Sequence, residues 1–192
     1  MTLITLASNR GRACSPKTSK FRLRPPMAKD GAAVNRLIAD CAPLDTNSVY
    51  CNLLQCTHFS QTSVIAEDGS SIGGFVSGYV QPEQPDVLFV WQVAVAHHAR
   101  GHKLGAAMID HLLFRPVCDG IHYIETSISP DNAASWALFN SIAQNHNTQL
   151  ESTPWFSARH HFDGDHDDEH LVRIGPFFLD SRKAPKQWGA SE

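Results

Sequence analysis

The sequence has few charges and no long apolar run. Only 18% of the 192 residues are charged and the formal net charge is -3, so the chain lacks the broad cationic surface that nucleic-acid-binding proteins use against phosphates. No stretch approaches the roughly 18 consecutive apolar residues that a membrane-spanning helix needs. The opening residues also lack the basic segment and apolar core of a secretory signal. The hydrophobic fraction of 42% is that of an ordinary globular domain, for which we expect a small ligand.

Paired cysteine motifs are absent as well. The chain has five cysteines, an odd number, and none of them forms a C-x-x-C pair. This pattern favours neither a disulfide framework nor a zinc ribbon. We therefore expect free thiols in a reducing compartment, and a cytoplasmic protein.

Composition divides the chain into three segments. Residues 1–20 carry arginine and lysine but no acid and no periodic apolar pattern, which predicts a disordered extension; a transit peptide is the alternative. Residues 21–179 contain all the periodic segments and are predicted to form one domain. Residues 180–192 are predicted to be a flexible tail.

The apolar periodicity of residues 21–179 predicts a mixed α/β domain with a central sheet flanked by helices. The strand at 87–95 is almost continuously apolar, as is typical of a strand in the middle of a sheet. The predicted elements are strands at 21–24, 63–67, 72–80, 87–95, 122–128, 150–156 and 171–175, and helices at 28–39, after 48, from 104 and after 132.

A candidate anion site follows the strand at 87–95. The segment RGHKLG at 100–105 opens a helix, and the first-turn N–H groups of a helix have no partner within it. Gly101 and Gly105 would let a phosphate approach the backbone closely, and Arg100, His102 and Lys103 add positive charge. The alternative is a glycine-bearing helix start that binds nothing.

This segment resembles the Q/R-x-x-G-x-G/A signature of the GCN5-related N-acetyltransferases, whose loop binds the pyrophosphate of acetyl-CoA. Arg100 and Gly105 match the signature, and Lys103 replaces its middle glycine. Asn132, which opens a later helix, fits a second family pattern. The resemblance implies the GNAT fold and acetyl-CoA as co-substrate. It also implies cofactor contacts at Val93, Val95, Arg100, Gly101, His102, Lys103, Gly105, Ala106, Asn132 and Ser135.

One family residue is missing. The tyrosine that often acts as general acid seven residues after the asparagine is Phe139 here. A phenyl ring has no proton to donate, so we expect Phe139 in the core. Protonation of the departing thiolate is then expected from water or another side chain.

Three further segments resemble the diaminobutyrate acetyltransferases of ectoine biosynthesis: LDTNSVY at 44–50, FVWQVAV at 89–95 and GDHDDEHLVRIGPF at 164–177. Segments 74–80 and 126–136 extend this resemblance. It implies transfer of the acetyl group of acetyl-CoA to the γ-amine of L-2,4-diaminobutyrate, a homodimer, and no metal.

A small zwitterion with a second amine needs carboxylates around its ammonium groups. The resemblance points to Asp45 and Glu169 for this role, and one of them is expected to act as the base. Tyr50 is expected to form a hydrogen-bonding wall and Trp91 an aromatic wall. The alternatives are a helix N-cap role for Asp45 and core filling for Trp91.

The segment 160–170 is rich in histidine and aspartate and raises the possibility of a metal site. It lacks the spacing of helical metal-binding motifs, so we expect a solvated loop that contributes one or two substrate contacts. Two other functions stay open. The fold could acetylate another small amine or amino acid, or the chain could be a non-catalytic module that responds to CoA or a metal.

Overall fold

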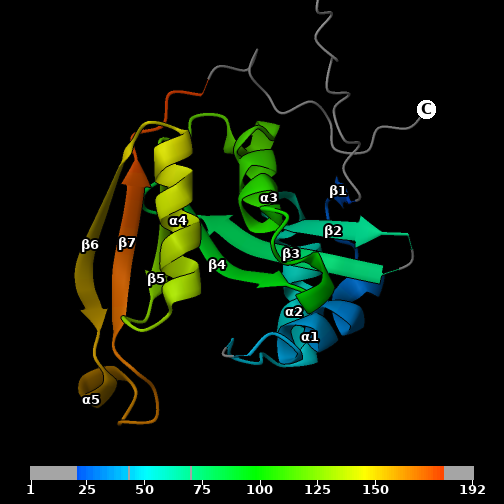
Figure 1. Ribbon diagram of the computed structural model, residues 1–192, viewed down its shortest axis with the longest axis horizontal. Helices are drawn as coiled ribbons and strands as arrows, with labels where there is room; N and C mark the ends of the chain where they lie inside the picture. Colours follow the sequence, from blue (N-terminus) through cyan, green and yellow to red (C-terminus); the bar gives the residue numbers. More distant parts are fainter. Residues whose placement is uncertain (1–20, 43, 70, 180–192) are drawn as a thin grey trace, which may run out of the picture.

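The computed structural model describes residues 21–42, 44–69 and 71–179 (Figure 1). The predicted extension at 1–20 and the predicted tail at 180–192 lie outside these residues. One sheet contains all seven strands in the order β1-β2-β3-β4-β5-β7-β6. The strands are β1 Arg22–Arg24, β2 Val64–Asp68, β3 Ser71–Val80, β4 Val87–Val95, β5 Tyr123–Ile128, β6 Gln149–Phe156 and β7 Glu169–Gly175. The helices are α1 Gly31–Ala39, α2 Val49–Thr57, α3 Leu104–Leu113, α4 Ala133–Asn145 and α5 Ala158–His161.

The sheet is mixed, as predicted. Every neighbouring pair is antiparallel except β4 and β5, which are parallel. The parallel pair needs a crossover connection, and α3 supplies it between the two strands. The apolar segment at 87–95 forms β4 at the centre of the sheet, which confirms the prediction from its composition.

The two faces of the sheet carry separate apolar cores. On β2, Val64 and Ala66 point to one face and Ile65 points to the other, because successive side chains of a strand alternate. The first face packs against α3 and α4, which include Met108 and Ile142. The second face packs against α1 and α2 over only part of its width. Figure 1 shows α3 and α4 in front of the sheet and α1 and α2 at one end of it.

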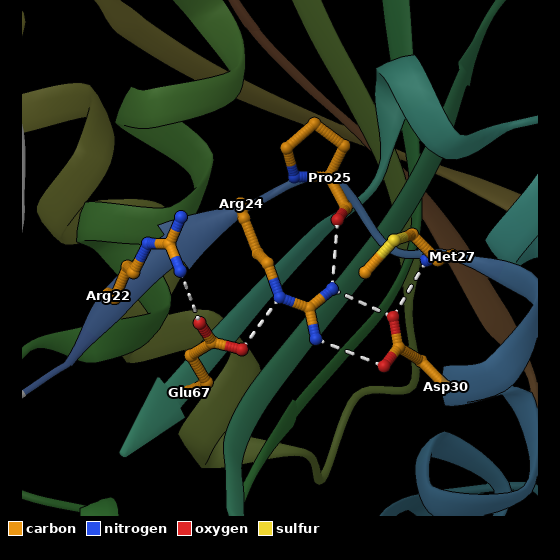
Figure 2. A network of polar contacts seen from close by, with 6 residues as sticks. All are labelled: Arg22, Arg24, Pro25, Met27, Asp30 and Glu67. Atoms are coloured by element: carbon orange, nitrogen blue, oxygen red, sulfur yellow. Dashed lines mark hydrogen bonds and ion pairs between the residues drawn. The ribbon is translucent and has the colours of Figure 1, made fainter. Parts of the chain in front are cut away.

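Ion pairs of Arg24 connect β1 to the turn before α1 and to β2 (Figure 2). Arg24 donates two hydrogen bonds to the carboxylate of Asp30, at 2.8 and 3.0 Å, and a third to Glu67 of β2 at 2.7 Å. Burial raises the pKa of Asp30, but the hydrogen bonds from Arg24 and from the N–H of Met27 outweigh it and hold the pKa below its ordinary value. Arg24, Asp30 and Glu67 together join β1, β2 and the turn before α1.

The strands β4 and β5 separate after a short stretch. They pair only from Val87 to Phe89, against Tyr123 to Glu125, so the edge of β4 that faces β5 has no strand partner beyond residue 89. A bulge between Ser77 and Gly78 also leaves Trp91 without an opposite residue on β3. The two strands therefore diverge beyond Phe89 of β4 and Glu125 of β5.

Two details differ from the expectations, and a third excludes the alternative role considered for Asp45. The helix expected at 28–39 begins as a 3-10 turn at Ala28–Asp30 and becomes α-helical at Gly31. The segment expected to be a loop at 160–170 begins within the one-turn helix α5. Ser48, not Asp45, is the N-cap of α2, since its hydroxyl accepts a hydrogen bond from the N–H of Cys51 at 3.1 Å. Within the described residues, no helix is both long and apolar enough to cross a bilayer.

Candidate active site

A cavity of about 560 Å³ opens between the diverging ends of β4 and β5. Residues 90–93 of β4 and 126–129 at the end of β5 form its two walls. The segments before α2, before α4 and before β7 complete it. Its lining is Leu44, Asp45, Asn47, Val90, Trp91, Gln92, Val93, Thr126, Ser127, Ile128, Ser129, Asp131, Asn132, Ser135, Phe139, Gly164, Asp165, His166, Asp167 and Glu169.

The ionisable side chains of this lining are predominantly acidic. Five carboxylates, those of Asp45, Asp131, Asp165, Asp167 and Glu169, face one histidine, and neither lysine nor arginine is among the lining residues. Such a lining attracts a cationic ligand and repels an anionic one. The anionic parts of a ligand must therefore be bound by backbone N–H groups and by amide or hydroxyl side chains.

Glu169 is the most buried of the candidate acids. It begins β7, its side chain is only 13% exposed, and Oε2 is buried without a hydrogen-bond partner among the described residues. Burial raises the pKa of Glu169, and a hydrogen bond with Ser127 and the charge of His166 lower it only in part. A carboxylate with an unused oxygen and a raised pKa is suited to accept a proton.

Asp45 lies at the rim of the same cavity, and its side chain is 78% exposed. Its position is fixed through its backbone. Gln92 of β4 donates a hydrogen bond from Nε2 to the carbonyl of Asp45 at 3.0 Å, and Asn47 donates one to Oε1 of Gln92 at 3.0 Å. The structure thus brings Asp45 and Glu169 to one cavity, and Asp45 is free of the N-cap role considered as its alternative.

His166 lies between the two acids. Its Nε2 is 3.3 Å from Oδ2 of Asp45 and 4.0 Å from Oε1 of Glu169. Sequence reasoning noticed His166 only as a possible metal ligand and missed its place between the predicted substrate-binding residues. It also missed Gln92 and Asn47, because nothing in a single sequence indicates that a strand glutamine holds a loop 45 residues away.

The two predicted aromatic walls differ in position. Trp91 lines the cavity and is 45% exposed, so the alternative of core filling is wrong; the bulge turns this residue out of the regular pairing. Tyr50 lies at the exposed start of α2 and is not among the lining residues. Its substrate contact stays a prediction.

The start of α3 has the features of an anion site. Lys103 is its N-cap residue in the left-handed conformation, with φ of 56°, and the side chain of Lys103 makes no capping hydrogen bond. Gly101 also has a positive φ, 79°, which glycine adopts without strain. The first N–H groups of α3 are therefore free of intrahelical and capping partners.

The other predicted cofactor residues have varied surroundings. Val93, Asn132 and Ser135 line the cavity. Asn132 is the N-cap of α4 and accepts a hydrogen bond from the N–H of Ser135 at 3.1 Å. Arg100 donates a hydrogen bond from Nε to the carbonyl oxygen of Val95, the last residue of β4, at 3.2 Å. The ring of His102 lies beside that of Phe21, with centroids 6.3 Å apart.

Gly105 lies close to two neighbouring elements. A Cβ atom there would lie 3.3 Å from both terminal carbons of Leu138 and 3.5 Å from Val93. The missing side chain therefore makes room for α4 and β4, and the close approach of a phosphate to Gly105 stays a prediction. Ala106, beside it, is buried. Phe139 is buried in the core, as expected, and its ring forms part of the cavity wall.

The histidine- and aspartate-rich loop and the start of β7 contribute His166, Asp165, Asp167 and Glu169 to the cavity. Among the residues that the structure describes, no three His, Cys, Asp or Glu side chains are grouped so as to hold a metal ion.

Comparisons with known proteins agree with this geometry. The acetyltransferase (GNAT) family model matches residues 33–142. The L-2,4-diaminobutyric acid acetyltransferase of Methylotuvimicrobium alcaliphilum is 52% identical over 155 residues, which are 81% of this chain and 90% of that protein. The enzyme of the same name from Bordetella parapertussis is 48% identical, over 82% of this chain and 86% of that protein.

A solved structure gives the same result. The diaminobutyrate acetyltransferase of Paenibacillus lautus, in complex with its substrate L-2,4-diaminobutyric acid and coenzyme A, superimposes with a TM-score of 0.79. It is 42% identical to this chain, and the match covers 83% of this chain and 97% of that one. The acidic cavity, the uncapped start of α3 and this degree of similarity lead to one conclusion: the chain belongs to the acetyltransferase (GNAT) family and, within it, to the L-2,4-diaminobutyric acid acetyltransferases.

Proposed function

We propose that this protein transfers the acetyl group of acetyl-CoA to the γ-amino group of L-2,4-diaminobutyrate. The product is N-γ-acetyl-2,4-diaminobutyrate, the precursor from which ectoine is closed. The observation that carries the proposal is the cavity between β4 and β5, whose ionisable lining is five carboxylates and one histidine. Diaminobutyrate has two ammonium groups and one carboxylate, so most of its charge is complementary to this lining.

Acetyl-CoA fits at the other side of the opening. The free N–H groups of Leu104, Gly105 and Ala106 at the start of α3 would bind its pyrophosphate, because a helix N-terminus favours negative charge. The unpaired edge of β4 beyond residue 89 would direct backbone N–H groups at the thioester carbonyl. Acetyl-CoA supplies the activated acyl group, and the protein positions it against the amine.

The amine must lose a proton before it can attack, since an ammonium group has no lone pair. Glu169 is suited to receive that proton, because its Oε2 is buried without a partner and burial raises its pKa. Asp45 at the rim would hold the second ammonium group. A C–N bond then forms, the C–S bond breaks, and the thiolate of CoA leaves. Phe139 cannot protonate that thiolate, so the proton comes from water or from another side chain.

The active unit is proposed to be a homodimer. The sheet face that α1 and α2 leave open carries a row of rings, Tyr79, Phe89 and Trp155, with centroids 5.3 and 6.0 Å apart. Trp155 on β6 is 39% exposed, and β6 is the last strand of the sheet. A second copy would bury the exposed end of this row at Trp155. Sedimentation equilibrium of the protein and of a Trp155→Glu variant tests this: the variant should be monomeric.

We also place the protein in the cytoplasm. The cysteines of the described residues, Cys41, Cys51, Cys56 and Cys118, are free thiols, and this supports a reducing compartment.

Product analysis tests the proposed reaction. The protein is incubated with acetyl-CoA and diaminobutyrate, and NMR identifies which nitrogen carries the acetyl group. Acetylation of the γ-nitrogen supports the proposal. Acetylation of the α-nitrogen, or faster turnover of ornithine, lysine or a polyamine under the same conditions, would contradict it.

A further inference from the structure

Among the described residues that line the cavity, His166 is the one basic side chain, and both of its ring nitrogens face acceptors. Nδ1 is 2.9 Å from the carbonyl oxygen of Asp167, and Nε2 is 3.3 Å from Oδ2 of Asp45. A carbonyl oxygen and a carboxylate both accept hydrogen bonds and donate none. Both contacts are therefore hydrogen bonds only when both nitrogens carry a proton, that is, when His166 is an imidazolium.

The surroundings of His166 favour that charged form. Asp45 faces it from the segment before α2, Glu169 from β7, and Asp165 and Asp167 belong to its own loop. Asp131, before α4, lines the same cavity. The hydrogen bond to the carbonyl of Asp167 and, against a smaller effect of burial, the charges of Asp45 and Glu169 raise the pKa of His166.

This arrangement matters because Asp45 and Glu169 are the residues that the proposed function assigns to the ammonium groups of the substrate. We propose that His166 is a positioning residue that acts as an internal counter-ion for Asp45 and Glu169, and that binding of the diamine takes over this role and releases the proton of His166. The inference rests on the proposed function and adds to it a proton-linked step in substrate binding.

Electrostatics gives the direction of the effect. An ammonium group bound to Asp45 and Glu169 lies close to His166, and a nearby like charge disfavours the protonated imidazole. His166 then loses its proton to the solvent, while its neutral ring keeps the hydrogen bond to Asp167. Before binding, the imidazolium holds Asp45 toward Glu169 and reduces the repulsion among the five acids.

The consequence is a pH-dependent affinity. At a pH where His166 is protonated, the diamine must displace a cation, so binding is weaker. As pH rises through the titration of His166, the competitor disappears and the dissociation constant of the diamine falls. If one proton is released per diamine bound, linkage makes this change about tenfold per pH unit on the acidic side of that titration.

Proton counting by calorimetry tests the inference. Diaminobutyrate is titrated into the protein with CoA present, between pH 6 and 7, in two buffers of different ionisation enthalpy. Wild type should release more protons per diamine than His166→Gln, by up to about one. His170→Gln is the matched control: it removes a histidine of β7 that does not line the cavity, and its proton release should equal that of wild type. Equal release by wild type and His166→Gln would overturn the inference.

A second measurement uses only the wild-type protein, so it is valid even if the His166→Gln variant fails to fold. The Cε1 proton of His166 in the wild-type protein is titrated by NMR with and without diaminobutyrate. The pKa of His166 should fall when the diamine is present, and an unchanged or raised value would overturn the inference. The two proposals fail separately. A protein that γ-acetylates diaminobutyrate while His166 keeps its titration loses only this inference, whereas a protein that neither binds nor acetylates diaminobutyrate contradicts the proposed function itself.

Discussion

Gly105 of α3 lies directly against Leu138 of α4, and a Cβ atom at Gly105 would be 3.3 Å from both terminal carbons of that leucine. This contact is tighter than ordinary packing, so the glycine sets how closely the two helices approach. Because α3 begins at Leu104, the same contact also fixes the orientation of the N–H groups proposed to bind pyrophosphate. Helix packing and cofactor binding thus depend on one position.

Gly105→Val should therefore destabilise the protein and weaken acetyl-CoA binding together. Overpacking of a core contact costs about 1–3 kcal/mol of unfolding free energy, and the shift of α3 should raise the KM for acetyl-CoA more than that for the amine. Thermal unfolding and steady-state kinetics measure the two effects. Adding Leu138→Ala should restore part of the KM, because it makes room for the valine.

Gly101→Ala is the control for that rescue. Its Cβ would meet open space, and its φ of 79° makes the cost one of backbone strain alone. Leu138→Ala should not improve this variant. Equal rescue of both variants would show that the Gly105–Leu138 contact is not the cause.

Glu169→Gln should lower kcat at least about a hundredfold, because the amide cannot accept the proton of the amine. The pH profile gives an independent check. Since burial raises the pKa of Glu169 above its ordinary value, the acid limb of kcat, measured at saturating diaminobutyrate, should lie above pH 4.5, with activity lost as pH falls through it. Retention of that limb in Glu169→Gln would assign the base to another group.

Asp45→Asn should have a smaller and different effect. Asp45 is 78% exposed, so the loss of a solvent-screened contact to an ammonium group should raise the KM for diaminobutyrate about two- to fivefold while kcat changes little. The KM for acetyl-CoA should stay constant. Asp165→Asn, which removes the same charge from the same cavity, is the control; an equal rise in KM there would indicate a general field effect instead of a specific contact.

Arg24→Gln should destabilise the fold by about 3 kcal/mol, since it leaves the carboxylate of Asp30 buried without its cation. Arg22→Gln is the matched comparison. Arg22 contacts Glu67 at 3.1 Å, but its side chain is 64% exposed against 16% for Arg24, and exposed pairs contribute about 0–1 kcal/mol. Urea unfolding of both variants measures the difference; similar losses would refute the buried network as the source of stability.

His111 should make stability fall in mild acid. Burial, with a smaller effect of Arg115, lowers the pKa of His111 to about 4, so between pH 6.5 and 4 the unfolded chain binds more protons at this site than the folded chain. Unfolding free energy should therefore decrease as pH falls through this window, by up to about 3 kcal/mol from this site. His111→Gln should flatten that part of the curve, and an unchanged slope would exclude His111 as its origin.

The sequence alone was sufficient to predict the secondary-structure elements and the protein family. Alternating and helical apolar periods depend on local geometry, so the strand at 87–95 and the helices on either side of it were predictable. The reaction class was predictable from residues 100–105, from Asn132 and from the segments that resemble the diaminobutyrate acetyltransferases. An anion site at a helix N-terminus is formed by consecutive residues, so a local sequence pattern can indicate it.

What surrounds Asp45 and Glu169 was decided only by tertiary structure. The separation of β4 from β5 after Phe89, the bulge beside Trp91 and the hydrogen bond from Gln92 to the backbone of Asp45 are relationships between segments far apart in the chain. The reason that position 105 is glycine also lies in Leu138, 33 residues later, and no local pattern contains that information. Local propensity specifies which elements form. The close packing of those elements determines which side chains meet. It is this packing that places His166 beside Asp45 and Glu169.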